Sequence, residues 1–327
     1  DLTRLDRIRA FDPTEGIVRA DAGVSLAEIL RLAVPRGWFL PVCPGTRFVT
    51  LGGAVANDVH GKNHHVAGTF GRHVTAFELL RSDGVKRTCS TDENPALFAA
   101  TIGGLGLTGA ITWVELRLRR IRSSGIDQER IRLPSIEAFF EVDAASTEVE
   151  HTVAWVDLIG GRGRGIYIRG TTADDGPALD APPRPVRDVP FDAPSFVLGR
   201  ASMRMFNAVY WHTLRGDRDR RVVHWEPFFF PLDAVGRWNR LYGRRGFLQY
   251  QCVVGGDDGG RAGILELARR IAASGEPVFL GVLKRFGDLP SPGLLSFPRP
   301  GATLAVDLPF RGPSTLGLLD TLDAVVA

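Results

Sequence analysis

The sequence predicts an α+β protein with two domains, and three observations support this prediction. The chain has 327 residues, which is long enough for a sizeable core and for two domains. Its residues are 44% hydrophobic and 24% charged, as in an ordinary soluble globular protein. Strand and helix patterns are mixed up to about residue 122, whereas the later strand patterns are typical of one antiparallel sheet flanked by helices. We therefore expect domains at residues 1–122 and 123–327.

The first elements are predicted to be a strand and a helix. Residues 16–24 alternate as a strand, and Ser25 with Glu28 forms a capping box at the start of a helix. Apolar residues then recur at helical spacing until a Pro and a Gly end the pattern. A short strand at 38–42 follows. We interpret this unit as scaffold.

The segment 44–65, PGTRFVTLGGAVANDVHGKNHH, has the most unusual composition in the chain. It combines a Gly pair, three His, two Asn, an Asp and one of only three Lys. Residues 48–50 predict a strand and 54–56 a short helical turn, with a tight turn at Gly52 and Gly53 between them. Glycines there let bare backbone N–H groups approach a ligand, and a helix N-terminus favours an anion, which together suit a phosphate or pyrophosphate. A solvated polar loop is the alternative.

A glycine-rich run at 103–109, GGLGLTG, contains the pattern GxGxxG. In a dinucleotide-binding Rossmann unit this pattern follows a strand and opens a helix. Here a short helix is predicted before it, at 94–101, and a strand with alternating apolar residues after it, at 110–121. Because the order is reversed, we interpret the glycines as a tight turn against which another backbone or a flat cofactor packs. A hairpin with an Asp-Gly turn is predicted before this unit, at 74–87.

The second half is predicted to be rich in antiparallel strands. A Pro-rich stretch at 173–195 predicts a surface crossing or loop, and residues 262–274 predict a helix. The expected strands are at 151–157, 166–169, 224–233, 247–254 and 277–287.

Composition argues against several classes of function. The net charge is +3 with a pI near 9.0, and the basic residues are interspersed with acids, so a nucleic-acid surface is not indicated. Cys43, Cys89 and Cys252 are far apart and support neither a disulfide framework nor a zinc site, which favours a reducing compartment. The sequence contains no apolar run of about 18 residues, so no transmembrane helix is expected. The chain starts at Asp1 without Met and stops in an apolar helix, so we expect both ends to be cut short.

Two places in the sequence carry candidate chemistry. The run from His60 to His65 offers a base, a cation and an amide within six positions, but its spacing fits no metal-binding template, so no metal is expected. Lys284 lies in the middle of an otherwise apolar strand pattern. On a pocket wall its ammonium would bind an anionic oxygen or steer a proton, whereas on a solvated face it would have no special role.

Several stretches taken together resemble one known family. They are PGTRFVTLGGAVANDVHGKNHH, FGRHVTAFELLRSDG, GGLGLTG, AWVDLIG, FFFPLD, WNRLYGRRGFLQYQ and LKRFG. The chain resembles the FAD-dependent oxidoreductases of the vanillyl-alcohol oxidase type and, within them, the decaprenylphosphoryl-β-D-ribose 2-oxidase branch, the epimerase subunit of mycobacterial arabinan synthesis. The resemblance runs over almost the whole chain, and the HGKNHH run is specific to that branch.

The resemblance implies an α+β FAD-binding domain of the vanillyl-alcohol oxidase (PCMH) type at 1–122. It also implies a substrate-binding domain at 123–327 whose antiparallel sheet covers the flavin. In such enzymes hydride passes from a ribose carbon to flavin N5 while a base takes the hydroxyl proton, which leaves a 2-keto sugar for a partner reductase. The implied substrate is a polyprenyl-phosphate sugar, and the implied location is the cytoplasm or the inner-membrane surface, including its periplasmic face.

The resemblance also implies roles for individual residues. His60, Lys62 and Lys284 would be catalytic. FAD would be held by Gly45, Thr46, Thr50, Leu51, Gly52, Gly53, Asn57, Asp58, Val59, His60 and Ile111. The substrate would contact Trp155, Phe229, Gln249, Gln251, Phe286 and Thr303.

The chain departs from the family pattern at several points. Phe229 stands where the family has a Tyr in FYHPLD, and Thr303 and Ala305 replace an Asn and a Cys. The family's first phosphate-binding loop would precede Asp1, and its C-terminal segment with a Tyr and a catalytic Lys would follow Ala327. These departures leave the exact sugar and its lipid carrier open.

Three other functions remain as alternatives. The first is a soluble alditol or sugar-lactone oxidase of the same fold, which would need no lipid groove. The second is an inactive binding subunit, and the third is a nicotinamide dehydrogenase, whose glycine pattern has the wrong context here. Covalent attachment of the flavin, reactivity with oxygen and the oligomeric state are left open by the sequence.

Overall fold

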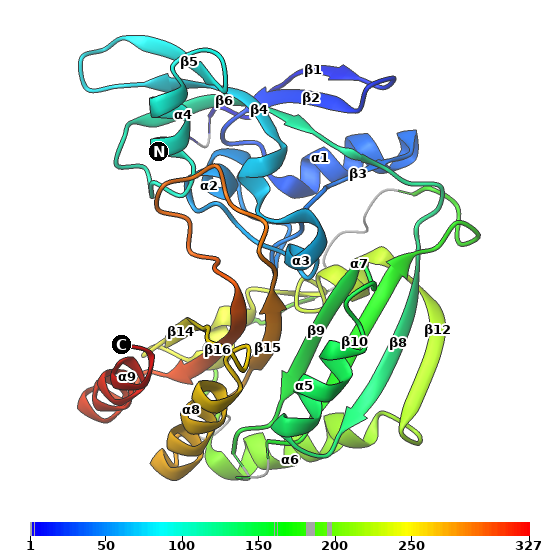
Figure 1. The fold of residues 1–327 in the computed structure, drawn as a ribbon, viewed down its shortest axis with the longest axis vertical. Coiled ribbons are helices and arrows are strands. Elements are labelled where there is room, and N and C mark those ends of the chain that lie inside the picture. Colours follow the sequence, from blue (N-terminus) through cyan, green and yellow to red (C-terminus); the bar gives the residue numbers. More distant parts are fainter. Residues whose placement is uncertain (1, 3, 160, 162, 181–186, 195–197) are drawn as a thin grey trace.

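Two antiparallel β-sheets, one in each half of the chain, organise the molecule, as the computed structural model shows (Figure 1). The structure describes residues 2, 4–159, 161, 163–180, 187–194 and 198–327. The five-stranded sheet is at the top of Figure 1 and the seven-stranded sheet is below it. No helix in these ranges is long and apolar enough to span a bilayer.

The five-stranded sheet has the order β1-β2-β6-β4-β5, and every neighbouring pair is antiparallel. Its buried face packs against α1 and α2 around a core that includes Val18, Leu30 and Phe77. The strands are β1 (Ile8–Asp12), β2 (Ile17–Asp21), β4 (Val74–Leu80), β5 (Lys86–Ser90) and β6 (Ala110–Arg117), with β3 (Trp38–Phe39) paired to β7 (Arg119–Arg120) beside them. The helices are α1 (Leu26–Ala33), α2 (Leu51–Ala56), α3 (His64–Ala67) and α4 (Pro95–Thr101), with 3-10 turns at Val34–Arg36 and Phe70–His73.

Several predictions for this half are confirmed. The capping box forms, because the Ser25 hydroxyl accepts from the Glu28 N–H and the Glu28 carboxylate accepts from the Ser25 N–H. The Asp-Gly turn joins β4 to β5, with Gly84 at a positive φ of 76°. The run 103–109 follows helix α4 and leads into strand β6, so it is a turn and not a Rossmann unit.

The prediction for residues 48–56 is wrong in part. No strand forms at 48–50, and Gly52 and Gly53 lie inside α2 rather than in a tight turn. Thr50 caps this helix, since its hydroxyl accepts from the Gly53 N–H. A Cβ at Gly52 would lie 2.7 Å from the Cβ of Ala22, so glycine lets α2 pack closely against the end of β2.

The seven-stranded sheet has the order β12-β8-β10-β9-β15-β16-β14 and is antiparallel throughout. Helices α5, α8 and α9 lie against one face and enclose a second core with Leu283 and Leu304. The strands are β8 (Gly125–Leu133), β9 (His151–Val156), β10 (Gly165–Thr172), β12 (Arg218–His224), β14 (Phe247–Val254), β15 (Gly281–Phe286) and β16 (Gly301–Pro309). The helices are α5 (Ile136–Ala144), α6 (Arg200–His212), α7 (Trp225–Phe229), α8 (Arg261–Ser274) and α9 (Pro313–Val326). The remaining pieces are the pair β11 (Arg187–Asp188) and β13 (Val235–Gly236) and the 3-10 turn Trp238–Tyr242.

The strand predicted at 224–233 is wrong. Strand β12 ends at His224, and the aromatic residues after it form α7. The His224 side chain accepts from the Glu226 N–H and so caps this helix. Trp225 and Phe228 then pack into the core of the first sheet rather than into the second. Within the predicted crossing at 173–195, residues 181–186 and 195 lie outside the described ranges.

The two halves are also joined by a strap, residues 287–300, that runs from β15 up to the first sheet and returns to β16 (Figure 1). The Asp58 carboxylate accepts hydrogen bonds from the hydroxyls of Ser291 and Ser296, each at 2.5 Å. The Leu294 N–H donates to the Ala99 carbonyl at 3.0 Å. The strap therefore fixes one end of the second sheet against the first half of the chain.

Candidate active site

The β-sheet register brings most of the predicted substrate residues onto one face of the seven-stranded sheet. Trp155 pairs with Val282, and Lys284 pairs with Thr303. Directly paired residues of antiparallel strands share a face, and so do residues two apart on one strand. Val282 and Gln251 both pair with Ala305, so β15, β16 and β14 present these positions on the same face. The face therefore carries Trp155, Gln249, Gln251, Lys284, Phe286 and Thr303.

His60, from the other half of the chain, reaches this face. Its Nδ1 lies 2.7 Å from Lys284 Nζ, and its Nε2 lies 3.3 Å from the Gln251 side-chain nitrogen. The Gln251 amide also donates to Thr303 Oγ1 at 3.0 Å. These side chains form one polar chain between the segment after α2 and the centre of the second sheet. We refer to Lys284, His60, Gln251 and Thr303 as the polar chain.

The far end of the polar chain fixes the hydrogen-bond roles along it. The Thr303 hydroxyl donates to the Cys252 carbonyl, so its oxygen is free to accept from Gln251. The Gln251 nitrogen then donates its second hydrogen to His60 Nε2. A neutral imidazole that accepts at Nε2 carries its proton on Nδ1. The His60 Nδ1–H can therefore donate to Lys284 when the lysine is a neutral amine.

The protonation of the two residues agrees with these roles. Burial, with added repulsion from Lys284, lowers the pKa of His60 well below its ordinary value. Burial, with added repulsion from Lys62, lowers the pKa of Lys284 to about 7. Lys284 is only 8% exposed, and among the described carboxylates none forms an ion pair with either lysine. The site thus holds a lysine that exchanges its proton near neutral pH.

Lys62 lies beside an aromatic cluster. Its ammonium donates to the Phe228 carbonyl and lies 4.7 Å and 5.7 Å from the ring centroids of Phe228 and Phe229. Burial lowers the pKa of Lys62 to about 8. Phe229 packs among Phe39 and His151 in the first core, and His151 lies four positions before Trp155 on β9, on the same sheet face.

Aromatic rings close one side of the polar chain. The Phe286 ring lies 4.8 Å from the His60 ring and 4.6 Å from the His64 ring. Phe297, on the strap, lies 6.1 Å from the His60 ring. The strap therefore contributes a wall of the site, which the sequence did not predict because nothing local connects residue 297 to residue 60.

The N–H groups of Gly52 and Gly53 are not free for a ligand. Gly52 donates to the Ala22 carbonyl at 2.8 Å, and Gly53 donates to the Thr50 hydroxyl at 3.2 Å. The buried Asp58 accepts from the Gly71 N–H at 2.7 Å as well as from the two strap serines. The interpretation of the glycine pair as bare phosphate-binding backbone is therefore wrong. These hydrogen bonds fix the start of α2 against the end of β2 and the residue after α2 against the strap.

The other predicted cofactor residues differ in accessibility. Gly45 and Asn57 are exposed, while Thr46, Thr50, Gly53, Val59 and His60 are half-buried. Leu51, Gly52, Asp58 and Ile111 are buried. Gly45 lies before α2 and Asn57 directly after it. At the C-terminal end of α2 the Leu105 N–H donates to the Ala56 carbonyl.

Sequence reasoning missed Asp307 on the same sheet face. Its carboxylate accepts from Gln249 at 2.8 Å and from the Tyr242 hydroxyl at 3.2 Å. Burial raises the pKa of Asp307 above its ordinary value. Asp307 lies four positions after Thr303, so the period of two along β16 could have found it.

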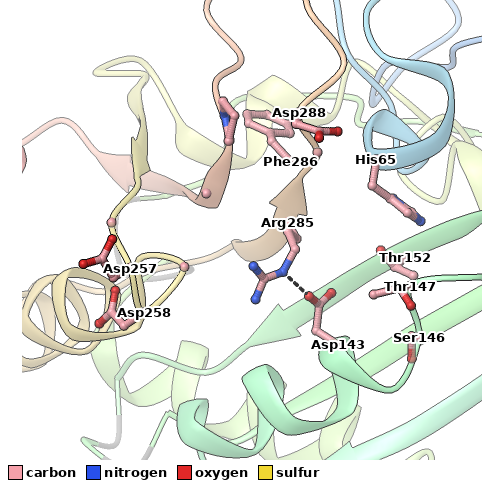
Figure 2. Close-up of a pocket in the computed structure, with 15 residues that line it drawn as sticks. His65, Asp143, Ser146, Thr147, Thr152, Asp257, Asp258, Arg285, Phe286 and Asp288 are labelled. Atoms are coloured by element: carbon pink, nitrogen blue, oxygen red, sulfur yellow. Dashed lines mark hydrogen bonds and ion pairs between the residues drawn. The ribbon is translucent and has the colours of Figure 1, made fainter.

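A cavity of about 740 Å³ lies on the other side of β15 (Figure 2). Arg285 points to that side and forms an ion pair with Asp143 on α5, at 2.5 Å. The lining of this cavity includes one predicted site residue, Phe286, and no residue of the polar chain. In the described residues no group of three or more His, Cys, Asp or Glu is placed to bind a metal ion.

Comparison with known proteins identifies the family. A family model described as an FAD binding domain matches residues 1–90. Decaprenylphosphoryl-beta-D-ribose oxidase of Mycolicibacterium smegmatis is 36% identical over 333 residues, which span 95% of this chain and 70% of that protein. The chain belongs to this family of FAD-dependent oxidoreductases.

Two further relatives differ in how much they share with the chain. An uncharacterized protein in the mprA 5' region of Streptomyces coelicolor is 35% identical over 326 residues, covering 93% of this chain and 86% of that protein. Delta(24)-sterol reductase of Rattus norvegicus is 33% identical over 111 residues, covering 34% of this chain and 22% of that protein. The first part of the chain thus has the PCMH-type FAD-binding fold, and the whole is an α+β oxidoreductase that uses FAD.

The residues around α2 fit this cofactor. Neither Gly45 nor Gly106 has an atom within 4 Å of the place where a Cβ would stand, so bare backbone faces open space there. Phe48, Leu105 and Leu107 expose large apolar side chains beside these glycines. Open backbone with apolar side chains suits a flat ring system and its phosphates. Which of the predicted residues contact FAD stays a prediction.

Proposed function

We propose that this chain oxidises the 2-hydroxyl group of a polyprenylphosphoryl-β-D-ribose to the 2-keto sugar. This would be the first half of an epimerisation to the arabinose form for cell-wall arabinan. The similarity to a decaprenylphosphoryl-beta-D-ribose oxidase over 95% of the chain supports the substrate class. The contact of 2.7 Å between Lys284 Nζ and His60 Nδ1 carries the chemical part of the proposal.

The polar chain provides a proton acceptor for this reaction. When bound, FAD supplies the acceptor for the hydride that leaves the sugar carbon. The alcohol must lose its hydroxyl proton as well, and a neutral lysine with a pKa of about 7 can take it. The Gly61 carbonyl accepts from the Lys284 amine at 3.2 Å and holds it in place, while Gln251 with Thr303 holds the tautomer of His60. The single lone pair of the amine turns from the His60 Nδ1–H to the sugar hydroxyl and takes the proton there. In this proposal Lys284 is the base and His60 orients it.

The other predicted residues are assigned to binding. Residues 1–122 hold FAD, and the sheet of residues 123–327 binds the sugar. Trp155, Gln249 and Phe286 line the sheet face around the sugar ring. The Lys62 ammonium, which has no carboxylate partner in the described part of the chain, attracts the phosphate. Phe229 supports Lys62 through its ring rather than through direct contact with the sugar.

The keto product requires a second enzyme. A ketone at C2 becomes the arabinose form only after a new hydride is added from the opposite side. We assign this step to a short-chain reductase that acts together with the chain at the inner-membrane surface, where a polyprenyl-phosphate substrate resides.

Product analysis tests the proposal. The protein loaded with FAD is incubated with a short-chain polyprenylphosphoryl ribose, and the product is reduced with sodium borodeuteride. We expect deuterium at C2 of the sugar. Turnover of free alditols or sugar lactones alone would replace the proposal with the soluble oxidase, and bound FAD without any turnover would replace it with a binding subunit.

A further inference from the structure

The outward face of α6 is apolar although it is exposed to solvent. Met205 and Val209 are 68% and 63% exposed, and they are four residues apart, so they project from the same side of the helix. Phe206 is exposed next to them. We refer to Met205, Phe206 and Val209 as the α6 ridge. Soluble surfaces rarely gather large apolar side chains on one helix face unless the face has a partner.

Positive charge surrounds the α6 ridge. The helix carries Arg200 and Arg204 and no acidic residue. Residues 200–221 contain six Arg and two Asp. Half of these arginines are paired on β12, where Arg218, Arg220 and Arg221 form ion pairs with Glu129, Asp127 and Asp219. The arginines on α6 itself have no ion-pair partner among the described carboxylates.

Two more arginines extend the positive rim at the C-terminal end of α6. The guanidinium of Arg130 lies 5.9 Å from the Tyr210 ring, and that of Arg132 lies 5.0 Å from the Trp211 ring. Neither forms an ion pair with a carboxylate in the described ranges. A cationic rim around an apolar ridge is the pattern of a helix that lies in the interface of an anionic bilayer.

The inner side of α6 leads to the proposed substrate face. The Tyr210 ring meets the Trp155 ring edge-on at 4.7 Å, and the Phe206 ring lies 5.6 Å from Phe279, just before β15. Asn207 anchors the helix by donating to Asp157 at 2.7 Å. A lipid tail that leaves the sheet face beside Trp155 therefore passes α6, an argument that rests on the proposed function.

We propose that α6 docks this enzyme on an anionic lipid bilayer, with Met205, Phe206 and Val209 among the acyl chains and the surrounding arginines at the headgroups. The part of the substrate face beside Trp155 then lies next to the membrane, so that a polyprenyl-phosphate substrate can enter without leaving the lipid phase.

Vesicle sedimentation tests the docking surface. The FAD-loaded protein is mixed with phosphatidylcholine vesicles that contain or lack phosphatidylglycerol. We expect binding to the phosphatidylglycerol vesicles that weakens as salt is added. The double variant Met205→Asp/Val209→Asp should lower the partition constant by at least about tenfold, since both side chains are withdrawn from the lipid. Arg204→Glu should lower it on the order of tenfold.

Leu316→Asp is the matched control. Leu316 is an exposed apolar residue on α9, so this variant should bind vesicles like the wild type. The proposal is overturned if the wild type stays in the supernatant, if the double variant still sediments fully, or if the ridge mediates only self-association in solution. Flavin reduction by a short-chain soluble substrate is measured in parallel. Reduction without vesicle binding rejects the docking surface alone, whereas vesicle binding without reduction supports the docking surface and rejects the proposed function.

Discussion

Lys284 is the residue on which the proposed chemistry depends most. Lys284→Met keeps the length of the side chain and removes the proposed base, while no ion pair is lost. We expect FAD to stay bound and the rate of flavin reduction by substrate to fall by about 10²- to 10⁴-fold. Stopped-flow absorbance of the flavin measures this rate. Lys86→Met, at an exposed lysine, is the control, and an unchanged rate in Lys284→Met would remove Lys284 from the mechanism.

The lowered pKa values of Lys284 and Lys62 lead us to expect a pH dependence of kcat/KM. If Lys284 is the base, as we propose, its neutral form must accumulate, so kcat/KM should rise as the pH passes about 7. In the proposed role Lys62 attracts the phosphate only while it is charged, so kcat/KM should fall above about pH 8. Lys62→Met should remove the falling limb. It should also shift the rising limb to higher pH, because the repulsion that lowers the pKa of Lys284 is gone. A profile that is flat between pH 6 and 9 would contradict both roles.

At the scale of elements, the strap depends on Asp58. Replacing Ser291 and Ser296 by Ala removes both hydroxyl donors to this buried carboxylate and should lower the free energy of unfolding by about 2 kcal/mol or more. Phe297 should then lose its position beside His60, so KM should rise more than kcat falls. Denaturant unfolding and steady-state kinetics measure the two effects. Ser314→Ala, at an exposed serine of α9, is the control, and the account of the strap fails if both variants behave alike.

Helix α2 provides a second test, in which two glycines are compared. In Gly52→Ala the new Cβ would meet Ala22 at 2.7 Å, and we expect a loss of about 1–3 kcal/mol of stability together with weaker FAD retention. Gly317 in α9 has no atom within 4 Å of a new Cβ, so Gly317→Ala should add up to about 1 kcal/mol. Thermal unfolding of the two variants shows the difference. Equal effects would mean that α2 does not need its close approach to β2.

The local patterns predicted those elements whose residues carry their own signal. Strands β14 and β15 were predicted from their own residues, and the period of two along a strand put Gln251 and Lys284 on one face once the register was known. Helix α1 was predicted from its capping box. The aromatic run at 225–230 was misinterpreted as a strand, because its helix depends on packing against the first core. Likewise, the partner of the Gly52 N–H lies on a segment thirty residues earlier in the chain, which no local pattern reveals.

At the scale of the whole molecule, the site exists only because both halves of the chain meet. His60 and Lys284 are 224 positions apart in sequence and 2.7 Å apart in space. The strap and helix α7 hold the two sheets in this relation, one through Asp58 and the other through the first core. The resemblance in sequence could name the residues on each side, whereas the polar chain that links them required the three-dimensional arrangement.

In the proposed reaction hydride leaves C2 of a polyprenylphosphoryl ribose while Lys284 takes the hydroxyl proton. The most direct measurement is anaerobic stopped-flow reduction of the flavin with this substrate and with the same substrate carrying deuterium at C2. We expect loss of the visible flavin absorbance with both substrates, and a severalfold slower loss with the deuterated one. Bleaching that shows no isotope effect at C2, or that occurs only with free sugars, would contradict it.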